Sequence, residues 1–293
     1  MTTATGPTGA QTGAEPTSPT TPALHPRVES SRSSATALLT GRPAPGPWHG
    51  MGRLALYSFW TLLTNPFSLG FAIFLPIFMY LMFGANQSYS DIWQVNANVA
   101  ASVLVNMAIY GTIMTSSSMG ANVSLERATG VSRLFALTPL PSAAQILARV
   151  IASLGISTVV IAITYIVGYL TGSRMHASAW PLSVAMIIAL SILPATIGLA
   201  AGFAVRSDGA FSVTSAITVV GSFASGMFIP LESMGAFFQH LAPWTPLYGI
   251  VQLVQMPLAG WDSFTWSWVV NYVVWTAIFG LLASWASRRD TGR

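Results

Sequence analysis

The stretch ERATGVSRLFALTPLP, from Glu126 to Pro141, places one glutamate and two arginines between two long apolar runs. A charged side chain inside hydrocarbon costs about 3 kcal/mol or more, so this stretch must lie in water or at the lipid headgroups. Its charges suit a short surface helix, and the Thr138–Pro141 sequence ends it because proline disfavours helical backbone. The pattern alone leaves two interpretations open. The stretch is either a basic loop that only fixes topology, or a docking segment for a cytoplasmic partner.

Composition around this stretch indicates an integral membrane protein. Only 7% of the 293 residues are charged and 53% are hydrophobic, whereas soluble domains carry about 25% charged residues. The chain has no cysteine, which excludes disulfides and thiolate chemistry. Lysine is also absent, so the chain cannot contain a Walker A loop, whose lysine contacts nucleotide phosphates. The four histidines show no zinc spacing. We therefore expect no enzyme activity, metal site or bound cofactor.

The first 50 residues are rich in threonine, alanine, proline, glycine and serine, and we predict a disordered cytoplasmic tail over residues 1–50. A transmembrane domain then fills residues 51–293. Its first segment, Gly52–Thr64, is amphipathic, aromatic and too short to span, which is typical of an interfacial elbow helix.

The remaining apolar runs predict an all-α integral membrane protein with six transmembrane helices, at about 67–83, 96–119, 146–170, 181–205, 209–228 and 265–286. The semi-polar region 229–264 contains four prolines and suits a short outer re-entrant or interfacial helical segment before the last span. Every arginine except Arg174 falls on one side of this topology, which predicts cytoplasmic N- and C-termini. We expect Arg149, early in the third span, to reach the cytoplasmic headgroups.

Two spans carry polar stripes at helical spacing. Asn98, Ser102 and Asn106 share a face of the second span, and Ser215, Thr218, Ser222 and Ser225 share a face of the fifth. Small and hydroxyl side chains let membrane helices pack closely, so helix packing alone can explain the serines and threonines, with no functional role required. For Asn106, packing and a translocation surface are equally good explanations. No acidic residue is predicted at mid-membrane, which argues against a proton-driven carrier.

Three passages resemble the permease subunit of ABC type-2 transporters, especially small actinobacterial drug-resistance exporters of the daunorubicin type. The first is Thr64-Asn65-Pro66-Phe67, leading into a span that ends at Phe83-Gly84. The second combines Glu126–Gly130 with Leu137–Pro141. The third is the outer sequence Gly226–Met234, followed by Ala242–Leu247 before the last span.

The resemblance implies a dimeric permease in the bacterial plasma membrane that works with a separate ABC ATP-binding subunit, where ATP and magnesium would bind. The exported compound would be amphiphilic, drug-like or antibiotic-like, and nucleic acid would not be a partner. Three groups of residues receive roles from it. Coupling to the ATPase falls to Glu126, Arg127, Gly130, Arg133, Leu137 and Pro139, the translocation path to Asn98, Asn106, Ser215, Thr218 and Ser222, and the outer gate to Phe228, Pro230 and Met234.

Other functions remain open at this point. The same architecture could export a glycan or a lipid-linked polymer. The chain could also be a membrane scaffold or immunity protein that binds a partner without transport, or an ion-driven carrier that needs no ATPase.

Overall fold

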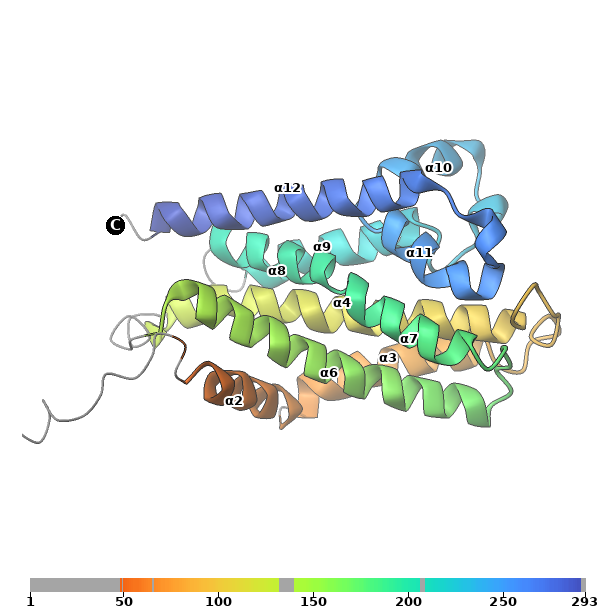
Figure 1. The fold of residues 1–293 in the computed structure, drawn as a ribbon, viewed down its shortest axis with the longest axis horizontal. Coiled ribbons are helices and arrows are strands. Elements are labelled where there is room, and N and C mark those ends of the chain that lie inside the picture. Colours follow the sequence, from red (N-terminus) through yellow and green to blue (C-terminus); the bar gives the residue numbers. More distant parts are fainter. Residues whose placement is uncertain (1–47, 49, 65, 132–139, 206–208, 291–293) are drawn as a thin grey trace, which may run out of the picture. The chain divides into compact units, whose positions relative to one another are not determined.

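The central helix of the computed structural model is α4 (Val99–Ala128), and most of its residues are buried. The structure describes residues 48, 50–64, 66–131, 140–205 and 209–290. Small and hydroxyl residues cover much of α4, which lets neighbouring helices approach closely. Figure 1 shows the helices that pack around it, namely α3 (Pro66–Phe83), α6 (Ser142–Leu170), α8 (Ile192–Ala204), α9 (Gly209–Ala224) and α11 (Tyr248–Ala259).

Four helical segments are long and apolar enough to cross a membrane: Val99–Ala128, Ala144–Leu170, Ala179–Ala204 and Trp266–Ser287. The chain is therefore a multi-pass membrane protein. Two further apolar helices are shorter, at Ala72–Phe83 and Gly209–Ala224. They coincide with the first and fifth predicted spans. Four of the six predicted crossings are thus supported by length and composition, and the other two stay predictions.

The fourth predicted span is broken at Ser191 into α7 (Ala179–Leu190) and α8. Pro194 accounts for the position of the break, because a proline ring clashes with the carbonyl four residues earlier, which here belongs to Leu190. The last long helix, α12 (Trp266–Asp290), runs beside α8 and α11.

The prediction of a separate surface helix beginning at Glu126 is wrong. Glu126 and Arg127 belong to the last turn of α4, which is 30 residues long. The helix ends where Gly130 adopts a φ of 79°, a left-handed conformation that glycine tolerates without steric cost. The predicted coupling residues Arg133, Leu137 and Pro139 lie outside the described residues.

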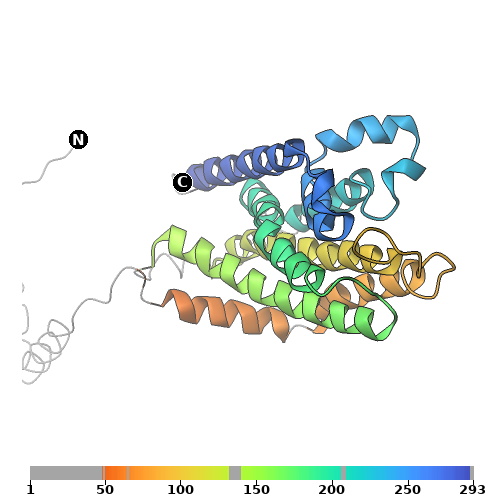
Figure 2. The same cartoon turned by 45° about the vertical axis from the view of Figure 1, so that its right-hand side comes forward.

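The predicted outer segment between α9 and α12 is helical and divides into two unlike parts. The first part contains η1 (Leu231–Ser233), the exposed α10 (Ala236–Leu241) and η2 (Ala242–Trp244). The second contains α11, which is largely buried, and η3 (Trp261–Ser263). In Figure 2 these blue elements lie at the end of the molecule opposite the C-terminus.

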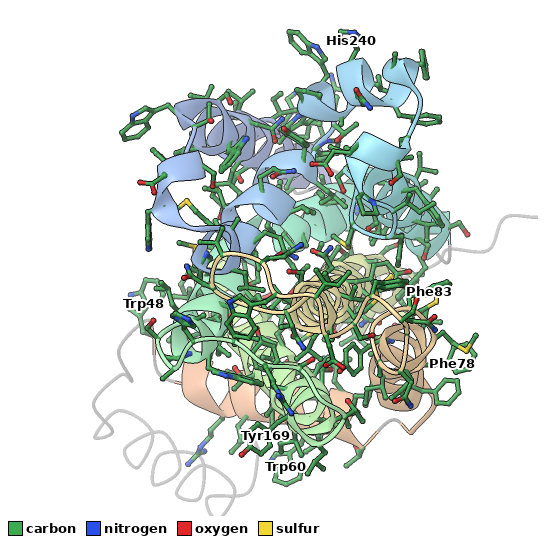
Figure 3. The ribbon with its side chains drawn as sticks, turned by 90° about the vertical axis from the view of Figure 1, so that its right-hand side faces the viewer. Trp48, Trp60, Phe78, Phe83, Tyr169 and His240 are labelled. Carbon is green, nitrogen blue, oxygen red and sulfur yellow. The ribbon has the colours of Figure 1, made fainter. Side chains whose placement is uncertain are left out.

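Helix α2 (Met51–Leu63) occupies the position of the predicted elbow and packs along α6, where Phe59 faces Gly155. Leu56, Tyr57 and Trp60 on α2 are exposed. Figure 3 shows Trp60, Phe78, Phe83 and Tyr169 on the outside of the bundle, pointing away from its core. Such apolar side chains are suited to contact with lipid. That α2 lies in the membrane interface stays a prediction.

Candidate functional site

The predicted coupling residue Glu126 forms an ion pair with Arg149 of α6. The Arg149 guanidinium donates a hydrogen bond to the Glu126 carboxylate, and Arg149 is only 8% exposed. The expectation that Arg149 extends to the headgroups is therefore wrong. A charge removed from water needs a partner of opposite sign, and Glu126 supplies it within the protein.

The neighbouring Arg127 fastens α4 to the end of α8. Its guanidinium donates to the carbonyl oxygens of Gly202 (3.1 Å) and Phe203 (3.0 Å) and lies 5.8 Å from the centre of the Phe203 ring. One turn earlier, Ser124 Oγ donates to the Val205 carbonyl at 2.9 Å. These acceptors belong to the last turn of α8 and to its C-cap Val205, where carbonyls have no partner inside the helix. The final turns of α4 therefore hold both α6 and α8.

Three glycines bring α4 and α8 into backbone contact. A side chain at Gly198 would collide with the Ser117 carbonyl, one at Gly120 with the backbone of Gly198 and Leu199, and one at Gly202 with the Gly120 carbonyl. Close approach of this kind allows a large backbone contact area between membrane helices. The Arg127 and Ser124 hydrogen bonds continue the same contact toward the helix ends.

Asn98 and Asn106, both predicted on the translocation path, make structural hydrogen bonds at the other half of α4. Asn98 is the N-cap of the helix, with its side chain accepting from the amides of Ala101 (3.0 Å) and Arg174 (2.9 Å). Asn106 donates to the Met227 carbonyl at 3.0 Å and accepts from Gln255 Nε2 at 2.6 Å. Asn106 thereby joins α4, the turn after α9 and α11. Their roles on a path stay predictions.

The residues predicted as an outer gate begin directly after Met227. The Phe228 ring packs against Tyr110 of α4, with centroids 5.0 Å apart, and against Phe223 at 4.7 Å. Pro230 is exposed and precedes η1, and Met234 follows it. Phe228 thus lies beside the Asn106 hydrogen bonds, while Pro230 and Met234 lie further along the outer segment.

A cavity of about 370 Å³ lies between α3, α4 and α9. The predicted path residues Ser215 and Thr218 line it, together with Ser117 and Thr214. The remaining lining is mostly apolar and consists of Ala72, Leu75, Pro76, Tyr110, Met114, Ser118 and Phe211. Ser222 is buried one turn beyond Thr218, and Asn98 and Asn106 are not among the lining residues.

Comparison with models of known protein families shows to which family this chain belongs. The family model of the ABC-2 type transporter matches residues 51–259, from the start of α2 to the end of α11. The chain belongs to the ABC-2 type transporter family. A comparison with curated proteins found no match. The chain is accordingly a membrane transport component, and the match covers Glu126, Arg149 and every helix that lines the cavity.

Sequence reasoning missed four residues that the ABC-2 fold brings into these sites. The sequence does not indicate the contacts of Arg149 and Gln255, because their partners Glu126 and Asn106 lie 23 and 149 positions away along the chain. Ser117 belongs to a run of hydroxyl residues from Thr115 to Ser118, which close packing of membrane helices explains without a function. Thr214 had a usable signal, since Thr214, Thr218 and Ser222 follow one another at four-residue spacing, which places them on one helix face. Among the described residues no group of three histidine, aspartate or glutamate side chains could hold a metal.

Proposed function

We propose that this chain is the permease subunit of an ATP-driven exporter, which moves an amphiphilic compound out of the cell. Its membership of the ABC-2 family supports a transport role. Energy from ATP would come from a separate ATP-binding subunit, because a chain without lysine cannot build a Walker A loop. We place the permease in the bacterial plasma membrane as a dimer of two permease chains.

The contacts made by the last turn of α4, at Glu126 and Arg127, are the observation that carries this proposal. Glu126, Arg127 and Gly130 belong to the first part of the segment proposed to dock on the ATPase, residues 126–141. Glu126 is tied to α6 through Arg149, and Arg127 is tied to α8 through the Gly202 and Phe203 carbonyls. A movement of the docking segment would therefore be transmitted to α6 and α8 through these charged contacts. A flexible attachment at this point would dissipate the movement.

The distribution of charge supports cytoplasmic termini. Arg53 of α2, Arg127, Arg149 and Arg289 belong to helix ends that gather at one end of the bundle in Figure 1. The opposite end carries Asp91 in the loop after α3, Arg174 in the loop after α6, and Glu232 and Asp262 in the short helices η1 and η3 of the outer segment. An excess of arginine on one side marks the cytoplasmic face of a membrane protein.

The proposed path for the exported compound uses the face of α9 that carries Ser215, Thr218 and Ser222 and the face of α4 that carries Asn98 and Asn106. Phe228, Pro230 and Met234 would close its outer end. The packing of Phe228 on Tyr110 supports this assignment, because it places an aromatic pair between the cavity and the outer segment.

The test is affinity purification of the tagged chain from its own host in mild detergent, with mass spectrometry of the proteins that accompany it. We expect a near-stoichiometric protein with a Walker A motif. ATP-dependent accumulation of an amphiphilic dye in inside-out vesicles should require that partner. If no ATPase is recovered even after cross-linking, the scaffold and ion-driven functions become the better explanations. Transport of a glycan, but not of dyes, would favour polymer export.

A further inference from the structure

The cavity between α3, α4 and α9 contains three buried hydroxyl groups that have no hydrogen-bond partner in the described part of the chain: Ser117, Thr214 and Thr218. Each of these residues is at most 4% exposed. Ser117 comes from α4, and both threonines come from α9. The three hydroxyls therefore approach one cavity from two helices.

These hydroxyls differ from most other buried hydroxyls on the same helices; Ser222 Oγ of α9 also lacks a partner among the described residues, but it does not line the cavity. Thr112 Oγ1 of α4 donates to the Ala108 carbonyl at 3.0 Å, and Thr115 Oγ1 donates to the Gly111 carbonyl at 2.7 Å. That local bond, four residues back, is the usual way for a threonine inside a membrane helix to satisfy its hydroxyl. Ser117, Thr214 and Thr218 do not make it. A buried hydroxyl without a partner is costly, so its persistence in a cavity points to a ligand that supplies the partner.

The rest of the lining determines which ligands fit. The side chains of Leu75, Pro76, Met114 and Phe211 offer an apolar surface. None of the described residues that line the cavity is charged. An ionised ligand would be transferred from water to this site without a counter-charge, which is strongly unfavourable. A volume of about 370 Å³ lies in the range of sites for small organic molecules.

We propose that this cavity binds an uncharged organic molecule with an apolar body and hydroxyl or carbonyl groups, and that Ser117, Thr214 and Thr218 determine its specificity. The proposal rests on the proposed transport function and narrows its substrate class from amphiphiles in general to uncharged ones. We expect a permanently cationic compound of the same shape to bind more weakly, because none of the described lining residues supplies a counter-charge.

The test is photolabelling of the purified full-length permease in detergent with azi-octanol, an uncharged alcohol that carries a photoreactive diazirine. Unlabelled octanol serves as competitor, and mass spectrometry locates the labelled residues. We expect saturable labelling of Tyr110, Met114 or Phe211. Thr214→Val combined with Thr218→Val should raise the half-saturating concentration about threefold to tenfold, the loss expected for one or two ligand hydrogen bonds. A trimethylammonium analogue should label these residues at least about tenfold more weakly.

Thr164→Val is the matched control. Thr164 is a buried threonine of α6 whose hydroxyl donates to the Val160 carbonyl at 2.8 Å, and it does not line the cavity. This variant should label like the wild type. Thermal unfolding without the probe separates binding from structure. Removing a hydroxyl that has no partner should leave the unfolding temperature of the Thr214→Val, Thr218→Val variant unchanged or raised, while its affinity falls.

Three results would overturn the proposal: labelling of the cavity that does not saturate, affinity that is unchanged in the double variant, or equal labelling by the cationic analogue. The assay contains no ATPase, so it is independent of transport. Intact labelling without ATP-driven transport would contradict the proposed function and leave the binding site standing. ATP-driven transport without saturable labelling would overturn the binding site alone.

Discussion

The carboxylate of Glu126, in the last turn of α4, accepts a hydrogen bond from the guanidinium of Arg149 early in α6. Arg149 is almost fully buried, and Glu126 is about one-third exposed at its side chain. The pair therefore joins the start of the segment proposed to dock on the ATPase, residues 126–141, to the helix bundle. Both the stability of the permease and its coupling to ATP hydrolysis should depend on it.

Glu126→Ala should leave the protein in the membrane but lower substrate-stimulated ATPase activity of the complex. The substitution removes the carboxylate that faces Arg149, and we expect a loss of stability of about 1–3 kcal/mol. The exchange Glu126→Arg with Arg149→Glu should recover part of both losses, because it restores opposite charges. Asp91→Ala, in the exposed outer loop, is the control. Normal coupled activity in Glu126→Ala would remove Glu126 from the coupling role.

Arg127→Lys should be more damaging than a conservative change of charge suggests. The guanidinium donates from Nη1 to two carbonyls of α8 while its carbon lies 5.8 Å from the centre of the Phe203 ring, and the shorter lysine side chain has no planar guanidinium to keep the ring contact together with both bonds. We expect Arg127→Lys and Arg127→Gln to lower stability by about 1–2 kcal/mol, measured as the thermal midpoint in detergent. Equal stability of the wild type and Arg127→Gln would show that this cap of α8 is unimportant.

Gly120→Ala and Gly198→Ala should each destabilise the permease strongly. A methyl group at either position meets backbone atoms of the facing helix, so α4 and α8 must separate. We expect reduced yield of monodisperse protein in fluorescence-detected gel filtration. Gly280→Ala in α12 is the matched control, since a side chain there meets no atom within 4 Å. It should be neutral or stabilising by up to about 1 kcal/mol, because alanine favours helix over glycine. Similar losses in all three variants would contradict the role of the close crossing.

Asn106→Ala and Gln255→Ala should show coupled effects on stability. Gln255 Nε2 donates to both Asn106 Oδ1 and the Ser102 carbonyl, so Gln255→Ala removes both of these bonds between α11 and α4, whereas Asn106→Ala removes one of them. A double-mutant cycle should give a coupling energy of about 0.6 kcal/mol or more, as found for hydrogen bonds between membrane helices. Strictly additive losses would mean that the two side chains act independently.

Local sequence predicted much of the helical architecture. The apolar runs predicted helices at the positions of α3, α6 and α12, and the aromatic segment after residue 50 predicted α2, because length and apolar content are local properties. The break at Ser191 was harder to predict. A proline inside a membrane helix is often tolerated, and only the structure shows that α7 and α8 are separate here.

The candidate sites were predicted less completely. Glu126 and Thr218 were singled out from their charge or spacing, and the structure places them at the α4 base and in the cavity. Arg149, which pairs with Glu126, was not predicted as a site residue, and neither were Ser117 and Thr214, which line the cavity with Thr218. Ser117 resembles an ordinary packing residue in sequence, and only its lack of a hydrogen-bond partner among the described residues distinguishes it from Thr112 and Thr115. Thr214 could have been found from its four-residue spacing to Thr218 and Ser222.

The sequence by itself determined that this is a helical membrane protein without lysine or cysteine, because hydropathy and composition are sums over local residues. It also determined which segments must lie outside the hydrocarbon, since burying a charged side chain in lipid is costly regardless of how the helices pack against each other. Only the tertiary structure decided which residues meet. Arg149 faces Glu126, and Gln255 faces Asn106, because the close crossing of α4 with its neighbours fixes the register of distant segments. The cavity has the same origin, since it lies where α3 and α9 pack on different parts of α4 and leave space between them.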